Sequence, residues 1–144
     1  FTCAAGGLNS NNIECWGNGD LDVVKGAPVA TPVEIVQLVA GKKHACAALA
    51  DNSLLCWGDD SKSQVSGAPT NTAVMAVSAG DYHTCATLVY GGITCWGDNT
   101  YGQSGGMSQS TLDSGAWVEA GANHSCAIYY NQQNGHSITG AKMY

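Results

Sequence analysis

Short apolar runs that end at glycine recur along the chain and predict β-strands. Three of them, Val33–Val39, Ala73–Ser78 and Ala116–Ala120, are rich in valine or small residues. The runs that follow two of these, His44–Ala50 and His83–Tyr90, alternate with the two-residue period of a strand. Neither face of these two runs is polar, so both faces should be buried, as in a sheet stacked between neighbouring sheets. No stretch of the chain predicts a helix.

These runs belong to a sequence unit that occurs four times. Three copies carry the motif His-x-Cys-Ala, and the first begins with its counterpart Phe1-Thr2-Cys3-Ala4. The cysteines of the motif follow one another at steps of 43, 39 and 41 residues, and three copies end in Cys-Trp-Gly. A period near 40 residues predicts a single repeat array over residues 1–144. Its copies are roughly 1–32, 33–72, 73–114 and 115–144.

Polar segments connect the copies, and turn residues separate the strands within them. The connectors are Gly19–Thr31, Asp59–Thr72 and Asp98–Ser114, and Gly91-Gly92 is one of the turns. About four antiparallel strands per copy, repeated in this way, predict an all-β fold. We expect a β-propeller-type array of about 3.5–4 blades.

A closed propeller has about four to eight blades, so an array of this size would leave apolar blade faces open at both ends. Three arrangements satisfy those faces. The chain is part of a longer propeller, two copies complete a ring, or the ends join head to tail in a filament.

The pattern Ala-Gly-x-x-His-x-x-Ala, followed by Trp-Gly-Asp-Asn-x-x-Gly-Gln, resembles the regulator-of-chromosome-condensation repeat. The second copy departs from it at Asp60 and Ser63. The cysteines that flank the hairpin are similar to those of the extracellular, Crinkly-type receptor repeats. The resemblance implies a propeller fold and is weak for function, because the family includes nuclear exchange factors, receptor ectodomains and inhibitors. The matching residues of the third copy are Gly80, His83, Trp96, Gly97, Asp98, Asn99, Gly102 and Gln103, and those of the second are Gly41, His44, Trp57, Gly58, Asp59 and Gln64.

Cysteine spacing favours disulfides across the hairpins. Two pairs are ten residues apart and lie equidistant from a turn, which places their β-carbons within disulfide reach. A metal site is the alternative, because His-x-Cys and a later cysteine offer several ligand types, but a fourth ligand and CxxC motifs are missing. The resemblance implies that the histidines are buried structural residues. The expected disulfide cysteines are Cys3 with Cys15, Cys46 with Cys56, and Cys85 with Cys95.

Cys126 is left without a partner in its own copy. Where the other copies have cysteine, the fourth has Ile138-Thr139-Gly140-Ala141-Lys142. Cys126 is therefore either a buried free thiol or the site of an intermolecular bridge.

Composition restricts the partners and the compartment. The chain has five lysines, no arginine and a net charge of -6, which argues against nucleic acid and against an anionic membrane surface. No apolar run is long enough for a membrane-spanning helix, so no membrane insertion is expected. Seven cysteines and a chain that begins at Phe1 predict a processed, secreted or extracellular protein.

No set of residues suggests catalysis, so we expect neither enzymatic activity nor a cofactor. Asp59-Asp60 and Asp98-Asn99 are interpreted as turn residues that bind backbone amides. Trp117 falls where other copies have Gln37 and Ala76, which makes it a possible exposed contact. Asn123 begins the only N-glycosylation sequon. The tryptophans Trp16, Trp57 and Trp96 recur at repeat spacing and are expected in the blade core.

Two functions fit these observations. The first is a non-enzymatic extracellular protein that acts as a self-associating structural or scaffold subunit. The second is a secreted module that binds another protein or a glycan, such as a receptor ectodomain, an inhibitor or a lectin-like propeller.

Overall fold

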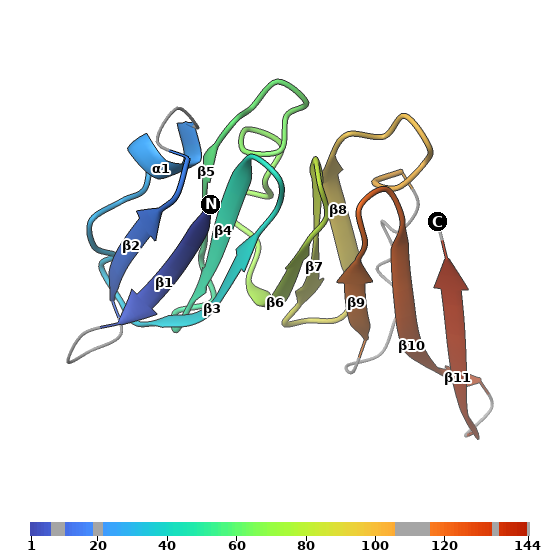
Figure 1. Ribbon diagram of the computed structural model, residues 1–144. Helices are drawn as coiled ribbons and strands as arrows, with labels where there is room; N and C mark the ends of the chain where they lie inside the picture. The colour runs from blue at the N-terminus through green and yellow to red at the C-terminus, as the bar shows by residue number, and fades with distance from the viewer. Residues whose placement is uncertain (7–10, 19–21, 106–115, 134–135, 144) are drawn as a thin grey trace.

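The computed structural model describes the whole chain except residues 7–10, 19–21, 106–115, 134–135 and 144. Its strands form four small antiparallel sheets that lie side by side in chain order, as Figure 1 shows. The first sheet pairs β1 (Thr2–Gly6) with β2 (Asn12–Trp16). The second sheet has the order β3 (Ile35–Ala40), β4 (His44–Leu49), β5 (Leu54–Gly58). The third has β6 (Val74–Ala79), β7 (His83–Leu88), β8 (Ile93–Gly97), and the fourth has β9 (Trp117–Ala120), β10 (Ser125–Gln133), β11 (His136–Met143).

The fold is nearly all-β, and the sheets are propeller-type blades whose middle strands are buried between neighbours. Every residue of β4 is buried, because the first and third sheets cover its two faces. The apolar clusters accordingly lie between successive sheets, so that each contains residues of two copies. One joins Ile13 to Ala47, the next Ala48 to Val77, and the third Ile93 to Val118.

The described sheets have two or three strands, and the expectation of about four per copy was wrong. The second connector shows why it adds no strand. Asp60 Oδ1 accepts the backbone amides of Val65 at 2.9 Å and Ser66 at 2.8 Å, so these amides bond to a side chain and not to a neighbouring strand. A connector held in this way cannot supply a further strand.

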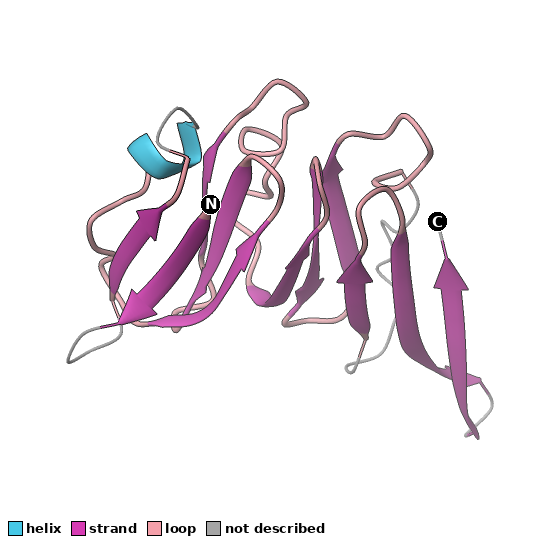
Figure 2. Cartoon of the chain, viewed as in Figure 1, coloured by secondary structure: helices cyan, strands magenta, loops and turns pink. Residues whose placement is uncertain are grey.

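The first connector contains one turn of helix, α1 (Asp22–Lys25), which the sequence did not predict (Figure 2). Four residues are too few for a hydrophobic period to be recognised. The turn is stabilised by tertiary contacts: Val23 is fully buried, and its carbonyl accepts a hydrogen bond from Trp57 Nε1 at 3.1 Å.

The fourth hairpin differs in register from the others. Cys126 pairs with Met143, whereas the sequence motif placed Gly140 opposite it. The reason is the length of the strands: β10 has nine residues and β11 has eight, whereas the hairpin strands of the third sheet have six and five. In the longer hairpin, the motif positions of the two strands no longer pair with each other. Among the described residues, no helix has the length and apolar character needed to cross a membrane.

Candidate functional site: the sheet junctions and the open ends

Each of the first three hairpins is closed by a disulfide between residues that face each other directly. Cys46 and Cys56 have their Cα atoms 4.1 Å apart, and Cys85 and Cys95 have theirs 4.0 Å apart. The twelve-residue pair, Cys3–Cys15, has a Cα separation of 4.1 Å. Disulfide sulfurs are not thiolates, so these six cysteines offer no metal ligand. No group of metal-binding side chains was found within the described part of the chain.

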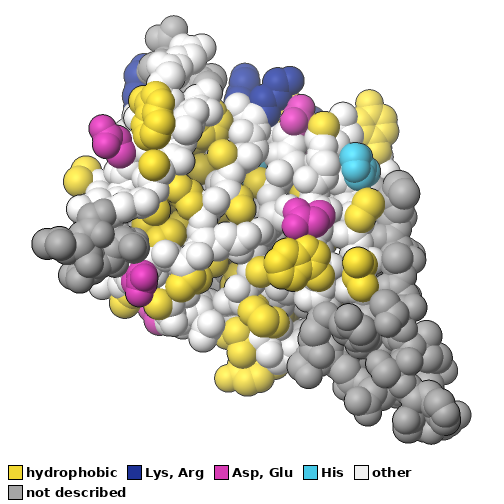
Figure 3. Space-filling view, turned by 60° about the horizontal axis from the view of Figure 1, so that its bottom comes forward, with side chains coloured by type: hydrophobic (Ala, Val, Ile, Leu, Met, Phe, Trp, Pro, Cys, Tyr) yellow, Lys and Arg dark blue, Asp and Glu magenta, His cyan; other side chains and the backbone are white. Residues whose placement is uncertain are grey.

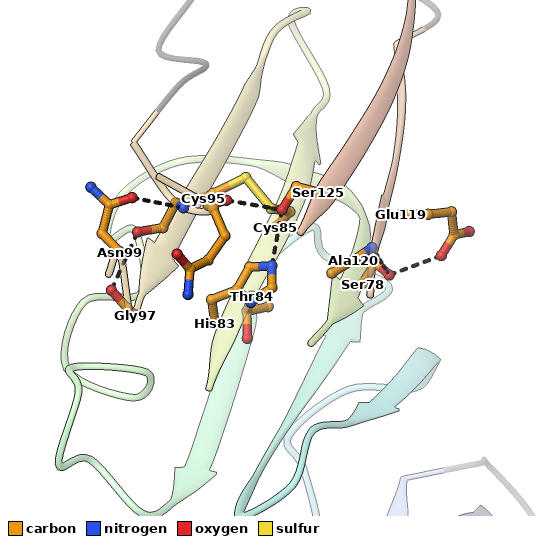
Figure 4. The surroundings of a disulfide bond; sticks show 12 residues. Ser78, His83, Thr84, Cys85, Cys95, Gly97, Asn99, Glu119, Ala120 and Ser125 are labelled. Atoms are coloured by element: carbon orange, nitrogen blue, oxygen red, sulfur yellow. Dashed lines mark hydrogen bonds between the residues drawn. A yellow bond between two sulfur atoms is a disulfide. The ribbon is translucent and has the colours of Figure 1, made fainter. Parts of the chain in front are cut away.

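A histidine and a hydroxyl link the second sheet to the third, and the third to the fourth. His44 Nε2 lies 2.7 Å from Thr84 Oγ1, and His83 Nε2 lies 2.9 Å from Ser125 Oγ (Figure 4). All four side chains are buried. Each of these two histidines is the first residue of the middle strand of its sheet. Each hydroxyl belongs to the residue that directly follows the motif histidine of the next copy. The link is therefore a repeated feature of the junction.

The hydrogen bonds of Ser125 fix the tautomer of His83. Ser125 Oγ donates its proton to the carbonyl of Gln103 at 2.9 Å, so it accepts the proton of His83 Nε2. Nδ1 of both His44 and His83 then faces no hydrogen-bond partner. Burial, together with the nearby His83, lowers the pKa of His44 to about 4, and Asp59 partly opposes this shift. Burial also lowers the pKa of His83. Both rings are neutral at physiological pH, which suits a structural and not an acid-base role.

The first junction has an apolar pair in place of the histidine and hydroxyl. Phe1 occupies the histidine position of the first copy, and Ala45 occupies the hydroxyl position of the second. Phe1 packs against the apolar cluster that contains Ala45. The two positions match each other, since a histidine facing Ala45 would leave a buried nitrogen without a hydroxyl.

Further hydrogen bonds join neighbouring sheets near their first strands. The amide of Gln37 bonds both backbone groups of Val77, with Nε2 donating to the carbonyl and Oε1 accepting the N–H, each at 2.9 Å. At the next junction Ser78 Oγ donates to Glu119 Oε2 at 2.9 Å and accepts the amide of Ala120 at 3.0 Å (Figure 4). These bonds fix the lateral position of one sheet against the next.

Two of the three turns before the middle strands pack against the backbone of the next turn so closely that only glycine fits. A β-carbon on Gly41 would lie 2.4 Å from the carbonyl oxygen of Gly80, and one on Gly80 would lie 2.3 Å from that of Gly121. The nearest atoms to a β-carbon on Gly121 would be those of the ring of its own His124. The three turns line an open groove of about 360 Å³ with no charged residue other than Lys42 and Asp81. Nothing in this groove resembles a catalytic arrangement.

Two of the repeat tryptophans anchor each sheet to the preceding connector, and the third does not. Trp57 is 5% exposed and Trp96 is 6% exposed, and Trp96 Nε1 donates to the carbonyl of Gln64 at 2.9 Å. Trp16 is 50% exposed, so the expectation that it lies in the core was wrong for this copy. Its position in the repeat is the same, but the described chain has no sheet and connector before it to cover the ring.

The carboxylates of the connectors accept hydrogen bonds within their own turns. Asp98 Oδ2 accepts Gln103 Nε2 at 2.8 Å, and Gln103 Oε1 accepts the amide of Tyr101 at 2.8 Å. Asn99 Oδ1 accepts the amide of Ser104 at 3.0 Å. Hydrogen bonds, the first of them from Thr100, lower the pKa of Asp98. Asn99 thus binds a backbone amide, as the sequence indicated, whereas Asp98 stabilises the turn by binding side chains and not backbone amides.

The fourth sheet leaves several side chains of the repeat exposed. Trp117 is 56% exposed, and its Nε1 donates to Glu119 Oε1 at 3.0 Å. His124 is exposed, although His44 and His83 are fully buried at the same position. Asn123 is exposed beside it, and Cys126 is a free, half-buried thiol. Neither contact by Trp117 nor a glycan on Asn123 follows from exposure, and both stay predictions.

Sequence reasoning missed the hydroxyls and the amide of Gln37. The signal was available: the residue after each motif histidine is Thr84 or Ser125, and it is Ala45 only where the preceding copy has Phe1. A pairing between copies is needed to interpret this pattern, and the sequence does not show which side chains face each other.

The surface of the assembly is poor in charge. Figure 3 shows one face, on which hydrophobic side chains lie among uncharged surface, with a few acidic side chains and with lysines near the top of the view. The exposed large hydrophobic residues of the first strands are Val36, Met75 and Trp117. Two inter-sheet ion pairs, Lys42–Asp81 at 3.7 Å and Lys62–Asp98 at 3.6 Å, lie at the surface and contribute little to stability.

Comparison with known proteins agrees with the repeat and the fold. Residues 35–64 and 74–103 match the regulator of chromosome condensation (RCC1) repeat. No curated protein sequence matches the chain. These two matched segments are the second and third sheets with the start of the connector that follows each.

Solved structures resemble the chain over most of its length. The ectodomain of the Physcomitrella patens receptor kinase CR4 is 21% identical, with a TM-score of 0.65, over 96% of this chain and 38% of that one. The CRINKLY WD40 ectodomain of the Arabidopsis thaliana receptor kinase ACR4 is 22% identical, with a TM-score of 0.67, over 96% of this chain and 52% of that one. Yeast RCC1, in its complex with Kap60, is 17% identical, with a TM-score of 0.64, over 84% of this chain and 39% of that one. The chain thus spans about half or less of these propellers, and at such identities the likeness concerns the fold.

Proposed function

We propose that this chain, which carries RCC1 repeats folded as propeller-type blades, is a non-enzymatic extracellular protein that acts as a self-associating structural or scaffold subunit. The observation that carries the proposal is the state of the two end sheets. Side chains that are buried between sheets in the middle of the array are exposed at its ends, as Trp16 and His124 are. Burying them against another sheet would satisfy both ends.

An extracellular site of action is supported by two observations. Three disulfides close the hairpins, and disulfides persist in oxidising compartments. Two of the similar structures are receptor-kinase ectodomains. The neutral, buried state of His44 and His83 and the turn role of Asp98 support a non-enzymatic protein, because these are the residues that would otherwise be candidates for acid-base chemistry.

The test is the mass of the oxidised, tag-free chain in solution as a function of concentration. Sedimentation velocity should show a species of at least twice the chain mass of 14.8 kDa that becomes populated as the concentration rises. A single species of 14.8 kDa up to the highest soluble concentration would overturn self-association.

A second candidate, a module that binds another extracellular protein or a glycan, is favoured by Trp117. An exposed tryptophan whose indole is held by Glu119 has the rigidity and surface area typical of a binding hot spot. Val36 and Met75, at 58% and 48% exposed, lie on the first strands of the two preceding sheets and could extend that surface. Screening against extracellular proteins and glycans with Trp117→Ala as the control would distinguish this function, because it predicts binding to a partner other than the chain itself.

A further inference from the structure

The two ends of the array carry complementary halves of the junction found between its sheets. At each junction a residue in the motif histidine position faces the residue that follows the motif histidine of the next copy. These positions hold His44 with Thr84, and His83 with Ser125. The fourth copy ends the series with His124, and the first copy begins it with Thr2, which is the residue in the hydroxyl position.

Both of these end residues, His124 and Thr2, are exposed to solvent. His124 lies against Gly121 as His83 lies against Gly80, but Nε2 of His124 faces the glycine, where His83 has Nδ1. The exposed ring of His124 therefore has to turn over to present Nε2 at a junction. Among the described residues, neither the ring of His124 nor the hydroxyl of Thr2 has a hydrogen-bond partner, and both residues are exposed. Thr2 lies on β1, the edge strand of the first sheet and the counterpart of the middle strand β4.

The internal junctions show that the two positions must match. A histidine is followed in the next copy by a hydroxyl, and Phe1 is followed by Ala45, which has none. His124 and Thr2 hold the same residue types as the two polar junctions. A histidine at one end and a hydroxyl at the other is the combination that bonds.

We propose that a second copy of this chain docks head to tail, so that His124 of each copy bonds the Thr2 hydroxyl of the other across a junction built like the internal ones. This inference rests on the proposed function and assigns its partner and its contact. Complementarity supports a second copy as the occupant, because one end presents a histidine and the other a hydroxyl, the two groups that bond at the internal junctions. In a two-membered ring of such chains both new junctions are the same.

The experiment exchanges the polar pair for the apolar pair of the first junction. His124→Phe alone places a phenylalanine against Thr2, and Thr2→Ala alone leaves His124 without a hydroxyl. Each should weaken the association measured by sedimentation by at least about tenfold, the loss typical of an unpaired polar group in a buried contact. The double variant Thr2→Ala/His124→Phe should return to within a few-fold of the original chain. Thr70→Ala, which removes an exposed connector hydroxyl, is the matched control and should change nothing.

Mixing the two single variants tests the head-to-tail geometry directly. In a mixed pair, the intact His124 of one chain meets the intact Thr2 of the other, and the introduced phenylalanine meets the introduced alanine. Mixed pairs should therefore form at least about tenfold more tightly than pairs of either variant alone. A symmetric contact between two fourth sheets cannot give this result, because each end would still meet its own kind.

The outcomes separate this inference from the proposed function. Association that neither single variant weakens, or that mixing does not restore, overturns the head-to-tail contact and leaves self-association through another surface. A chain that stays monomeric overturns both. Circular dichroism of each variant, matched to that of the original chain, excludes loss of the fold as the cause of weakened association.

Discussion

The two middle sheets and the two end sheets use the same motif residues in different environments. Cys46 and Cys85 are fully buried in the middle, whereas Cys3 and Cys126 are half-buried at the ends. The six residues of β4 are all buried, but in β1, its counterpart, four of five are exposed. Since the residue types are alike, burial in this molecule is set by the neighbouring sheet and not by the motif. A motif residue therefore stabilises the fold only where a second sheet covers it.

Replacing a repeat tryptophan should destabilise the fold far more in a middle sheet than in an end sheet, and this is the largest difference that we expect. Trp96→Ala empties a site in which the side chain is 6% exposed, and we expect a loss of about 3–5 kcal/mol in the free energy of unfolding. Trp16→Ala removes a ring that is 50% exposed, and the loss should be about 1 kcal/mol. Urea denaturation of the oxidised variants measures both. Equal losses would contradict the view that the neighbouring sheet determines the contribution.

The glycine turns provide a second comparison. A β-carbon at Gly80 would lie 2.3 Å from the carbonyl of Gly121, which is backbone and cannot move without displacing the fourth sheet. Gly80→Ala should therefore lower the free energy of unfolding by about 3 kcal/mol. In Gly121→Ala the nearest atoms to the new β-carbon are those of the ring of His124, which is exposed and free to rotate away, so its cost should be about 1 kcal/mol or less. Thermal unfolding of the pair should show Gly80→Ala clearly below Gly121→Ala.

Acid should weaken the middle junctions first. The pKa of His44 is about 4 in the folded chain and about 6.5 in the unfolded chain, so between these pH values the unfolded chain binds a proton that the folded chain does not. The free energy of unfolding should be constant above about pH 6.5 and fall as the pH drops toward 4, by an amount on the order of 3 kcal/mol from His44. His83 should add to the fall, because its pKa is also lowered.

A variant taken from the first junction isolates this contribution. His44→Phe with Thr84→Ala recreates the pair formed by Phe1 and Ala45, which packs without a titratable group. The dependence of stability on pH between 6.5 and 4 should become shallower in this variant. An unchanged pH profile would show that the burial of His44 is not its cause.

Removing a disulfide should lower the free energy of unfolding by nearly the same amount in a middle sheet and in an end sheet, which is the smallest difference that we expect. Their effect comes mainly from the length of the closed loop, which is ten residues for Cys85–Cys95 and twelve for Cys3–Cys15. Replacing either pair with alanines should cost somewhat under about 3 kcal/mol, with a difference between the pairs of well under 1 kcal/mol. Guanidinium denaturation of the two double variants tests this. A much larger cost for Cys85–Cys95 would show that burial, and not loop closure, dominates.

Features that act within one copy could be predicted from the sequence. The alternation of apolar residues placed the strands, the period near 40 residues gave the repeat, and the symmetric spacing of Cys46 and Cys56 about a turn agrees with their pairing in the hairpin. The turn formed at Asp98-Asn99 is largely local, since the hydrogen-bond partners of these two side chains lie within five residues. Such features depend on a few consecutive residues, and their geometry is set by the backbone.

Only the tertiary structure decided what happens between copies. It covered Trp96 but not Trp16, although both stand in the same motif, and it paired His83 with Ser125 some forty residues away. It also gave the fourth hairpin a register that its Ile-Thr motif did not indicate. The physical reason is common to all three: side-chain environment depends on which sheet lies opposite, and the sequence of one copy does not contain that information. The repeat motif therefore determines the strands and turns within a blade, whereas the neighbouring blade determines whether a motif side chain is buried and which group it bonds.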